Sequence, residues 1–219
     1  MYILYYYPGN ASLAVHMMLE ALGADYELAL VDRASNGQKS AEYLALNPAG
    51  RIPTLVDHKF LPDNEPLVIF ESAAICQHLL ERHPDSKLIP EVASAQRSEF
   101  YQWLMYLNNS VQAELMLYFY PEKYTSDFNG CEAVKHRAEQ RVTEMFELLN
   151  DKLATSTFIV GEQLSVCDFF LFMVANWAAS FEKAPLHMAN LKRYLQMMAR
   201  QECVKQAFSN EGRDLKKYQ

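Results

Sequence analysis

The first 83 residues alternate between short apolar runs and segments whose apolar residues recur at helical spacing. Runs rich in β-branched and aromatic residues indicate strands, and apolar residues three or four positions apart indicate helices. The predicted elements are, in order, a strand over 2–7, a helix over 12–22, a strand over 26–31, a helix over 40–46, strands over 54–56 and 66–70, and a helix over 71–82. This part of the chain is therefore predicted to be a β-α-β-α-β-β-α domain.

Residues with known turn and capping preferences separate these elements. Pro8-Gly9 ends the first strand, and Pro62-Asp63-Asn64 lies in a turn-rich segment between the last two strands. Ser12 stands where the N-cap of the first helix is expected, and Gly23 stands just after its last turn. These signals predict where the first helix begins and ends.

From residue 94 onward the pattern is helical, with no alternating segment between the long periodic stretches. The segment 83–90 before it contains two prolines, which predict a linker. We expect an α/β domain over 1–83, a linker over 84–93 and an all-α bundle over 94–219. The predicted helices of the bundle are 94–120, 131–154, 165–179 and 190–208.

Composition narrows the class of protein. The net charge is −7, so the chain lacks the clustered Lys and Arg that nucleic acid or an anionic membrane requires. No window approaches the ~18 apolar residues of a membrane span, and the start has no signal-peptide pattern. The four cysteines lie far apart and the histidines show no metal-binding spacing. We expect a cytoplasmic protein without a metal.

The segment Arg51-Ile52-Pro53 precedes a predicted strand. A cis Ile52-Pro53 bond would turn the backbone of Ile52 outward, where its N–H and C=O can pair with a peptide ligand as a strand does. The alternative is a trans proline in an ordinary loop. The residues alone leave both interpretations open.

Two hydroxyl side chains lie at predicted helix starts. The first N–H groups of a helix have no intrahelical partner, so Ser72 can help bind a carboxylate while Glu71 balances an ammonium group. Ser12 at the first helix start can stabilise a thiolate in the same way. The alternative for both sites is capping alone, because serine and glutamate also stabilise helix starts.

Three segments taken together resemble the cytosolic glutathione transferases, and the resemblance extends over the whole chain. They are PGNASLAVHMMLEALG at 8–23, NPAGRIPTLV at 47–56 and ESAAICQHLLE at 71–81. The Pro-Gly-x-x-Ser-Leu-Ala start is most similar to the bacterial beta-type members. In the helical half, GEQLSVCD at 161–168 resembles a buried helix start of the family, in which Ser165 and Asp168 would form a reciprocal capping box. The resemblance implies a thioredoxin-like N-terminal domain followed by an all-helical domain.

The resemblance also implies roles for individual residues. Pro53 is similar to the cis-proline of the family, and Ile52 to the backbone partner of the glutathione cysteine. Glu71 and Ser72 resemble the γ-glutamyl site. Lys39 and Arg51 are candidates for binding the glycine carboxylate. Tyr106, Asn109 and Gln112, on the first long helix of the bundle, are candidates for the second-substrate pocket.

The chain departs from the beta-type pattern at one position. The catalytic cysteine of that type would fall on Ala11, so an enzyme thiol is absent there. This disfavours a mechanism through a mixed disulfide between enzyme and substrate. Ser12, Tyr6 and Asn10 remain as candidates for stabilising the thiolate of glutathione.

The implied function is conjugation of the glutathione thiolate to electrophilic small molecules, with glutathione as co-substrate and a two-fold homodimer as the assembly. One alternative is a glutathione-dependent isomerase or a reductase that uses two glutathiones. Another is a non-catalytic ligand-binding or regulatory relative, because a fold does not determine a function.

Overall fold

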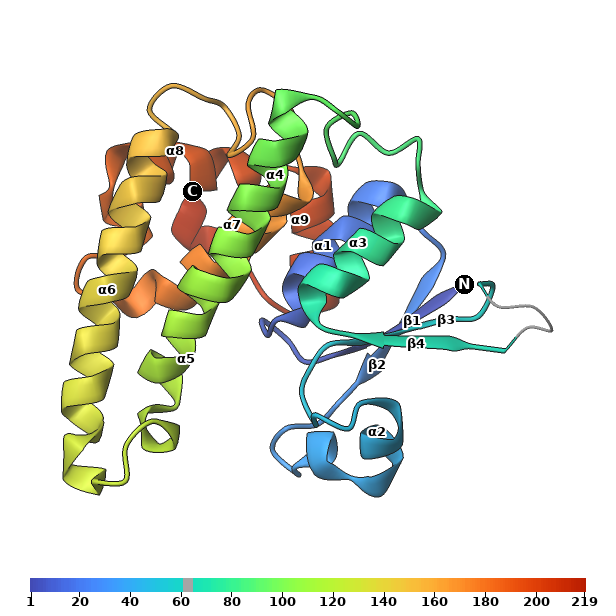
Figure 1. Cartoon of the computed structure of the whole chain (residues 1–219), viewed down its shortest axis with the longest axis horizontal. Coiled ribbons are helices and arrows are strands. Elements are labelled where there is room, and N and C mark those ends of the chain that lie inside the picture. The colour runs from blue at the N-terminus through green and yellow to red at the C-terminus, as the bar shows by residue number, and fades with distance from the viewer. Residues whose placement is uncertain (61–64) are drawn as a thin grey trace. The chain divides into compact units, whose positions relative to one another are not determined.

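The computed structural model describes residues 1–60 and 65–219, which form two compact units (Figure 1). The first unit consists of Met1–Ser86 and Ala199–Lys217, with Gln219. The second consists of Lys87–Met198, with Tyr218. The predicted boundaries at 83 and 94 stay a prediction, but Ala199–Lys217 belongs to the α/β unit, whereas Tyr218 belongs to the bundle.

The first unit contains a four-stranded sheet with the order β2-β1-β3-β4. β1 (Tyr2–Tyr6) pairs in parallel with β2 (Tyr26–Leu30), so the chain must cross over between them, which α1 (Ser12–Leu22) does. β3 (Thr54–Asp57) is antiparallel to both β1 and β4 (Leu67–Phe70). This is the predicted thioredoxin-like arrangement. The predicted turn at 62–64 lies outside the described residues.

Helices cover both faces of this sheet. Successive side chains of a strand point to opposite faces, so Tyr5 shares a face with Tyr7. Both pack on a buried cluster of Val31, Tyr43 and Ile52. Tyr43 belongs to α2 (Ala41–Leu46), which covers this face. Figure 1 shows α1 and α3 (Ser72–Arg82) side by side on the other face.

The second unit is a helical bundle around α7 (Val166–Trp177), in which every residue from Val166 to Asn176 is buried. The predicted capping box of Ser165 and Asp168 is confirmed at its start. The other helices of the bundle are α4 (Ala95–Met105), α5 (Ala113–Phe119), α6 (Cys131–Lys152) and α8 (Ala189–Met198).

Two of the predicted helices differ from the structure. The stretch predicted as one helix over 94–120 is interrupted by a π-helical segment, Tyr106–Gln112, between α4 and α5. The prediction of one helix over 190–208 is wrong, because α8 ends at Met198 and α9 (Glu202–Asn210) follows in the first unit. The extended backbone of Gln201 (φ −64°, ψ 135°) separates α8 from α9.

Candidate functional site

The turn before α1 brings the first candidates to the end of β1. The N–H of Asn10 donates to the carbonyl oxygen of Tyr7 at 3.0 Å, which closes the turn. Gly9 lies at φ +68°, a conformation that residues with a Cβ rarely adopt. The predicted C-terminal end of α1 is confirmed, since Gly23 is its left-handed C-cap (φ 57°).

Ser12 is not the N-cap of α1, contrary to the prediction. Ala11 occupies that position without a side-chain cap, and Ser12 is the first helical residue. Its side chain is fully buried. The hydroxyl donates to the carbonyl oxygen of Tyr7 at 3.2 Å and accepts the N–H of Tyr7 at 3.4 Å. The hydroxyl therefore ties the helix start to the end of β1, because the Pro-Gly turn shifts the cap by one residue.

Asn10 and Tyr6 lie on either side of this turn. The Oδ1 atom of Asn10 accepts the N–H of Ala11 at 2.7 Å, which fixes the orientation of the amide. Its Nδ2 atom has no hydrogen bond to any residue of the described ranges 1–60 and 65–219. The ring of Tyr6 lies edge-on to the ring of His16, with 6.4 Å between centroids. Asn10 thus keeps donor capacity at the helix start, whereas the Tyr6 ring packs on α1.

The Ile52–Pro53 bond is cis, as the resemblance implied. Side chains around it hold the adjoining turn by its backbone. The Tyr43 hydroxyl donates to the carbonyl oxygen of Arg51 at 2.6 Å, and the Asn47 Nδ2 atom donates to the same oxygen at 2.8 Å. Burial raises the pKa of Tyr43, so its hydroxyl keeps the proton that it donates.

The backbone of Ile52 has no hydrogen bond from its N–H or its C=O within the described part of the chain. A buried side chain with an unpaired backbone is unusual, since most such groups find a partner. Ile52 therefore offers one donor and one acceptor to an extended ligand, as a strand edge does.

The start of α3 adjoins the start of α1. The Ser72 hydroxyl donates to the carbonyl oxygen of Ala11 at 3.1 Å. Glu71 is the N-cap of α3, but its side chain makes no capping hydrogen bond, so the alternative that this glutamate serves as a cap is not supported. Glu71 is exposed and lies at φ 72°, ψ 114°, which is strained for a residue with a Cβ. Such strain in an exposed acidic residue points to a functional position.

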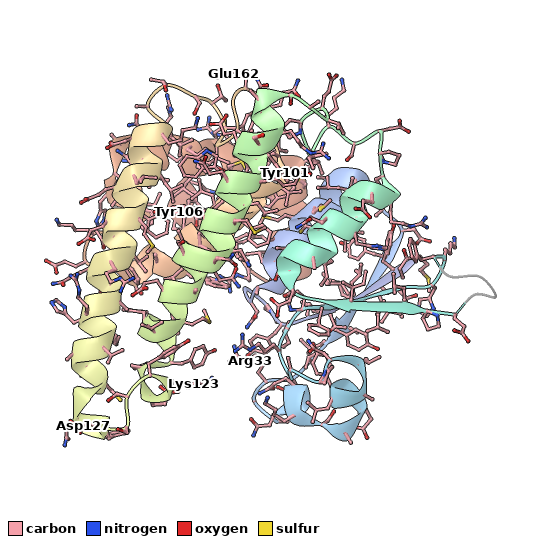
Figure 2. The ribbon with its side chains drawn as sticks, viewed as in Figure 1. Arg33, Tyr101, Tyr106, Lys123, Asp127 and Glu162 are labelled. Atoms are coloured by element: carbon pink, nitrogen blue, oxygen red, sulfur yellow. The ribbon has the colours of Figure 1, made fainter. Side chains whose placement is uncertain are left out.

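Two cationic candidates lie near the turn over 47–51. The Lys39 Nζ atom is 3.5 Å from the carbonyl oxygen of Ala49, and a Cβ placed on Gly50 would lie 2.6 Å from Nζ. Arg51 is exposed. Sequence reasoning missed a third cation, Arg33, which projects from the loop after β2 (Figure 2). Its guanidinium lies over the ring of Tyr7, at 5.6 Å from the centroid.

The second-substrate candidates belong to the second unit. Tyr106, Asn109 and Gln112 all lie on the π-helical segment of the α4–α5 helix, where Figure 2 labels Tyr106. The Gln112 Oε1 atom is buried and unpaired within the described residues. Asn109 is exposed, and the Tyr106 ring meets the Trp103 ring edge-on at 5.7 Å between centroids. π-Helical segments are frequent at functional sites, but the sequence pattern carries no sign of one here.

Two searches of the described residues give negative results. Residues 1–60 and 65–219 contain no group of three or more His, Cys, Asp and Glu side chains placed to hold a metal ion. None of the helices in these ranges is both long and apolar enough to span a membrane.

Comparison with known proteins adds a family to this geometry. The profile of the glutathione S-transferase N-terminal domain matches residues 1–81, and that of the C-terminal domain matches residues 83–202. The chain is 30% identical over 213 residues to glutathione S-transferase GstA of Escherichia coli O157:H7, covering 95% of this chain and 98% of the relative.

Two further proteins bear on the site. The chain is 28% identical over 168 residues to the disulfide-bond oxidoreductase YfcG of Escherichia coli K12, covering 75% of this chain and 74% of the relative. A glutathione transferase from Burkholderia graminis superposes with a TM-score of 0.81 and 28% identity, covering 94% of this chain and 86% of the other. Its structure holds two glutathione molecules per subunit.

Proposed function

The chain belongs to the glutathione S-transferase family, and from this premise we propose that it joins the glutathione thiolate to electrophilic small molecules. The hydrogen bond from Ser72 to Ala11 is the observation that carries the proposal, because it places the two candidate helix starts side by side. The carboxylate and the thiol of one glutathione can then bind at the neighbouring starts of α3 and α1. Glutathione is the co-substrate, and the protein supplies positioning and stabilisation of an anion.

Each part of glutathione has a proposed partner in the first unit. The unpaired backbone of Ile52, beside Pro53, binds the cysteine residue of glutathione as a strand would. The N–H of Ser72 and the carboxylate of Glu71 bind the γ-glutamyl carboxylate and ammonium groups. Lys39 and Arg51 bind the glycine carboxylate.

We assign the thiolate donor to Asn10 in preference to Ser12 and Tyr6. The Ser12 hydroxyl is buried and engaged with Tyr7, whereas the Asn10 amide keeps its donor capacity. Lowering a thiol pKa of ~8.5 by about two units needs roughly 2.7 kcal/mol. One hydrogen bond to an anion contributes about 1.5–3 kcal/mol. A single amide, with the dipole of α1, is therefore sufficient.

Three residues of the second unit are the proposed contacts for the electrophile. Tyr106, Asn109 and Gln112 provide an aromatic ring and amide groups on one short segment. Such a mixture suits a partly polar small molecule, which the apolar ring binds and the amides orient.

Calorimetry with glutathione, followed by turnover assays with a panel of electrophiles, tests the proposal. We expect saturable glutathione binding and loss of free thiol, measured by thiol titre, in the presence of at least one electrophile. Binding without turnover of any electrophile would instead support a non-catalytic ligand-binding protein.

A second candidate function is reduction of disulfides by two glutathiones. Ala11 removes the enzyme thiol, and two of the proteins described above are a disulfide-bond oxidoreductase and a transferase that holds two glutathiones. In this reaction one glutathione thiolate attacks the substrate disulfide and releases one substrate thiol. The second glutathione then attacks the mixed disulfide, which releases the other thiol and oxidised glutathione. Formation of oxidised glutathione with a small disulfide separates this candidate from conjugation.

We also propose a cytoplasmic homodimer, as the family resemblance implies. Light scattering should give about twice the 25.2 kDa of one chain. A mass of one chain across micromolar concentrations would contradict the dimer.

A further inference from the structure

A buried carboxylate–imidazole pair lies next to the proposed thiol site. The Nδ1 atom of His16, on α1, donates to the Oε1 atom of Glu211 at 2.9 Å. Both side chains are 0% exposed. Glu211 follows the last residue of α9, so residues 195 positions apart meet in the first unit. Charged groups are seldom buried so completely unless their hydrogen bonds are satisfied.

This pair contacts the turn that carries Asn10. The second carboxylate oxygen of Glu211, Oε2, accepts the N–H of Gly9 at 2.6 Å. One carboxylate therefore connects α1, through His16, with the residue immediately before Asn10. The other candidate donor, Tyr6, packs its ring on the same histidine. Gly9 and Tyr6, which flank the proposed thiol site, therefore both contact the His16–Glu211 pair.

Arg213 fixes the turn from a second direction. A Cβ placed on Gly9 would overlap the Nη1 atom of Arg213, so the guanidinium packs directly on the glycine backbone. The Nε atom of Arg213 is buried and makes no hydrogen bond within the described ranges. The guanidinium also lies over the Phe208 ring of α9, at 5.6 Å from its centroid. Gly9 therefore accommodates both a left-handed backbone and a close cation.

We propose that Glu211 and Arg213 are positioning residues for the glutathione thiol. They hold the Gly9–Ala11 turn so that the Asn10 amide and the first N–H groups of α1 face the sulfur. The proposal rests on the proposed function, since it requires glutathione at this helix start. Its physical basis is that an anion is stabilised by donors already fixed in place, and that small displacements of such groups cost large factors in rate.

The chain offers a matched control in the same unit. Asp57 is a second buried carboxylate that accepts a hydrogen bond from a histidine. Its partners are the ring of His78 at 3.0 Å and the backbone N–H of Lys59, also at 3.0 Å. It also pairs with Arg82 at 3.1 Å. None of these partners belongs to the turn before α1. Asp57→Asn therefore perturbs a similar pair without touching Gly9.

The experiment compares Glu211→Gln, Arg213→Ala and Asp57→Asn with wild type. It measures the melting temperature, the glutathione dissociation constant, kcat with an active electrophile, and the thiol pKa of bound glutathione. For Glu211→Gln and Arg213→Ala we expect kcat to fall about tenfold and the thiol pKa to rise by about half a unit to one unit. The glutathione dissociation constant should rise by a smaller factor than kcat falls, because Ile52, Glu71 and Ser72 remain in place. Asp57→Asn should lower only the melting temperature.

Several outcomes would overturn the proposal. One is that Glu211→Gln behaves like Asp57→Asn, with a lower melting temperature and an unchanged thiol pKa. Another is a fall in thiol pKa, which would mean that the negative charge of Glu211 outweighs its positioning. If Glu211→Gln does not fold, Arg213→Ala decides alone, because the Arg213 side chain is only half-buried. An unchanged kcat and thiol pKa in Arg213→Ala would then overturn the proposal. Failure of wild type to bind glutathione would overturn the proposed function itself, and this arm distinguishes the two.

Discussion

The starts of α3 and α7 are both built from a serine and an acidic residue, and they use the acidic side chain differently. At α7, Asp168 accepts the N–H of Ser165 at 2.8 Å and the N–H of Ile159 at 3.0 Å, and every partner is buried. At α3, Glu71 makes no capping bond, is exposed, and lies at φ 72°. The start of α7 satisfies its own polar groups, whereas the start of α3 leaves the Glu71 carboxylate without a capping bond.

This difference separates stability from function within one chain. A helix start whose polar groups are all hydrogen-bonded within the protein contributes to stability, since each satisfied donor avoids the cost of a buried unpaired group. A strained and open start costs stability and is kept where a ligand uses it. Mutations at the two sites should therefore change different quantities.

The largest expected effect is on stability, at the start of α7. Asp168→Ala leaves the N–H of Ile159, the N–H of Ser165 and the Tyr194 hydroxyl, which bonds Asp168 at 2.9 Å, without their acceptor. Because unsatisfied buried groups cost about 1–3 kcal/mol each and are not additive, we expect the free energy of unfolding to fall by about 3–5 kcal/mol. Denaturant unfolding measures this change. The glutathione dissociation constant, measured on folded protein, should not change.

Asp168 should also make stability depend on pH. Burial raises its pKa to about 6 from the usual 3.8, against the opposing effect of its hydrogen bonds. The folded state then holds this proton more tightly than the unfolded state, so the contribution is present below pH 3.8 and is lost as pH rises through 6. The full shift corresponds to about 3 kcal/mol.

The neutral variant Asp168→Asn isolates this contribution from those of other carboxyl groups. The stability difference between wild type and Asp168→Asn should move in favour of the variant between pH 4 and 7, by up to ~3 kcal/mol. A difference that stays constant with pH would show that Asp168 keeps an ordinary pKa.

At the start of α3, mutation should change glutathione binding and leave stability nearly unchanged. Glu71→Ala removes a charged hydrogen-bond acceptor, so glutathione binding should weaken by about 1.5–3 kcal/mol, roughly tenfold to a hundredfold. Stability should hardly change, because alanine at φ 72° keeps the strain. Calorimetry and thermal unfolding measure the two quantities.

Glu71→Gly sharpens this comparison. Glycine removes the same carboxylate and adopts the positive φ without strain, so this variant should gain about 1 kcal/mol of stability while binding as weakly as Glu71→Ala. Equal stability of the two variants would argue that the backbone at Glu71 is not strained. Unchanged binding in both would remove Glu71 from the site.

The smallest expected effect on the bound ligand concerns the start of α1. Asn10→Ala should raise the thiol pKa of bound glutathione by about one unit, equivalent to ~1.36 kcal/mol. Ser12→Ala should leave that pKa in place and lower stability by about 1 kcal/mol, because its hydroxyl bonds only the backbone of Tyr7. A shift in Ser12→Ala or Tyr6→Phe, but not in Asn10→Ala, would transfer the role to that residue.

Local patterns made much of this architecture predictable. The capping box of Ser165 and Asp168 spans three residues, and the order of strands and helices follows from short-range periodicity and turn residues. The role of Glu71-Ser72 as an uncapped start was not decidable from sequence, because the same residues also suit a cap. Its backbone strain is visible only in the structure.

One error has a local cause, whereas the second error and the omission depend on contacts between distant parts of the chain. Ser12 is displaced by one residue from its expected place because the Gly9 turn ends at Ala11. The break between α8 and α9 lies where the chain leaves the bundle for the first unit. The pairing of His16 with Glu211 joins residues 195 positions apart, so no local sequence pattern predicts it.

The central claim is that glutathione binds at the adjoining starts of α1 and α3 with its thiol ionised. The most direct measurement is the pH titration of thiolate absorbance for glutathione bound to the wild-type protein. The account predicts an apparent pKa about two units below the ~8.5 of a free thiol. A bound glutathione that titrates at the free-thiol value would contradict it.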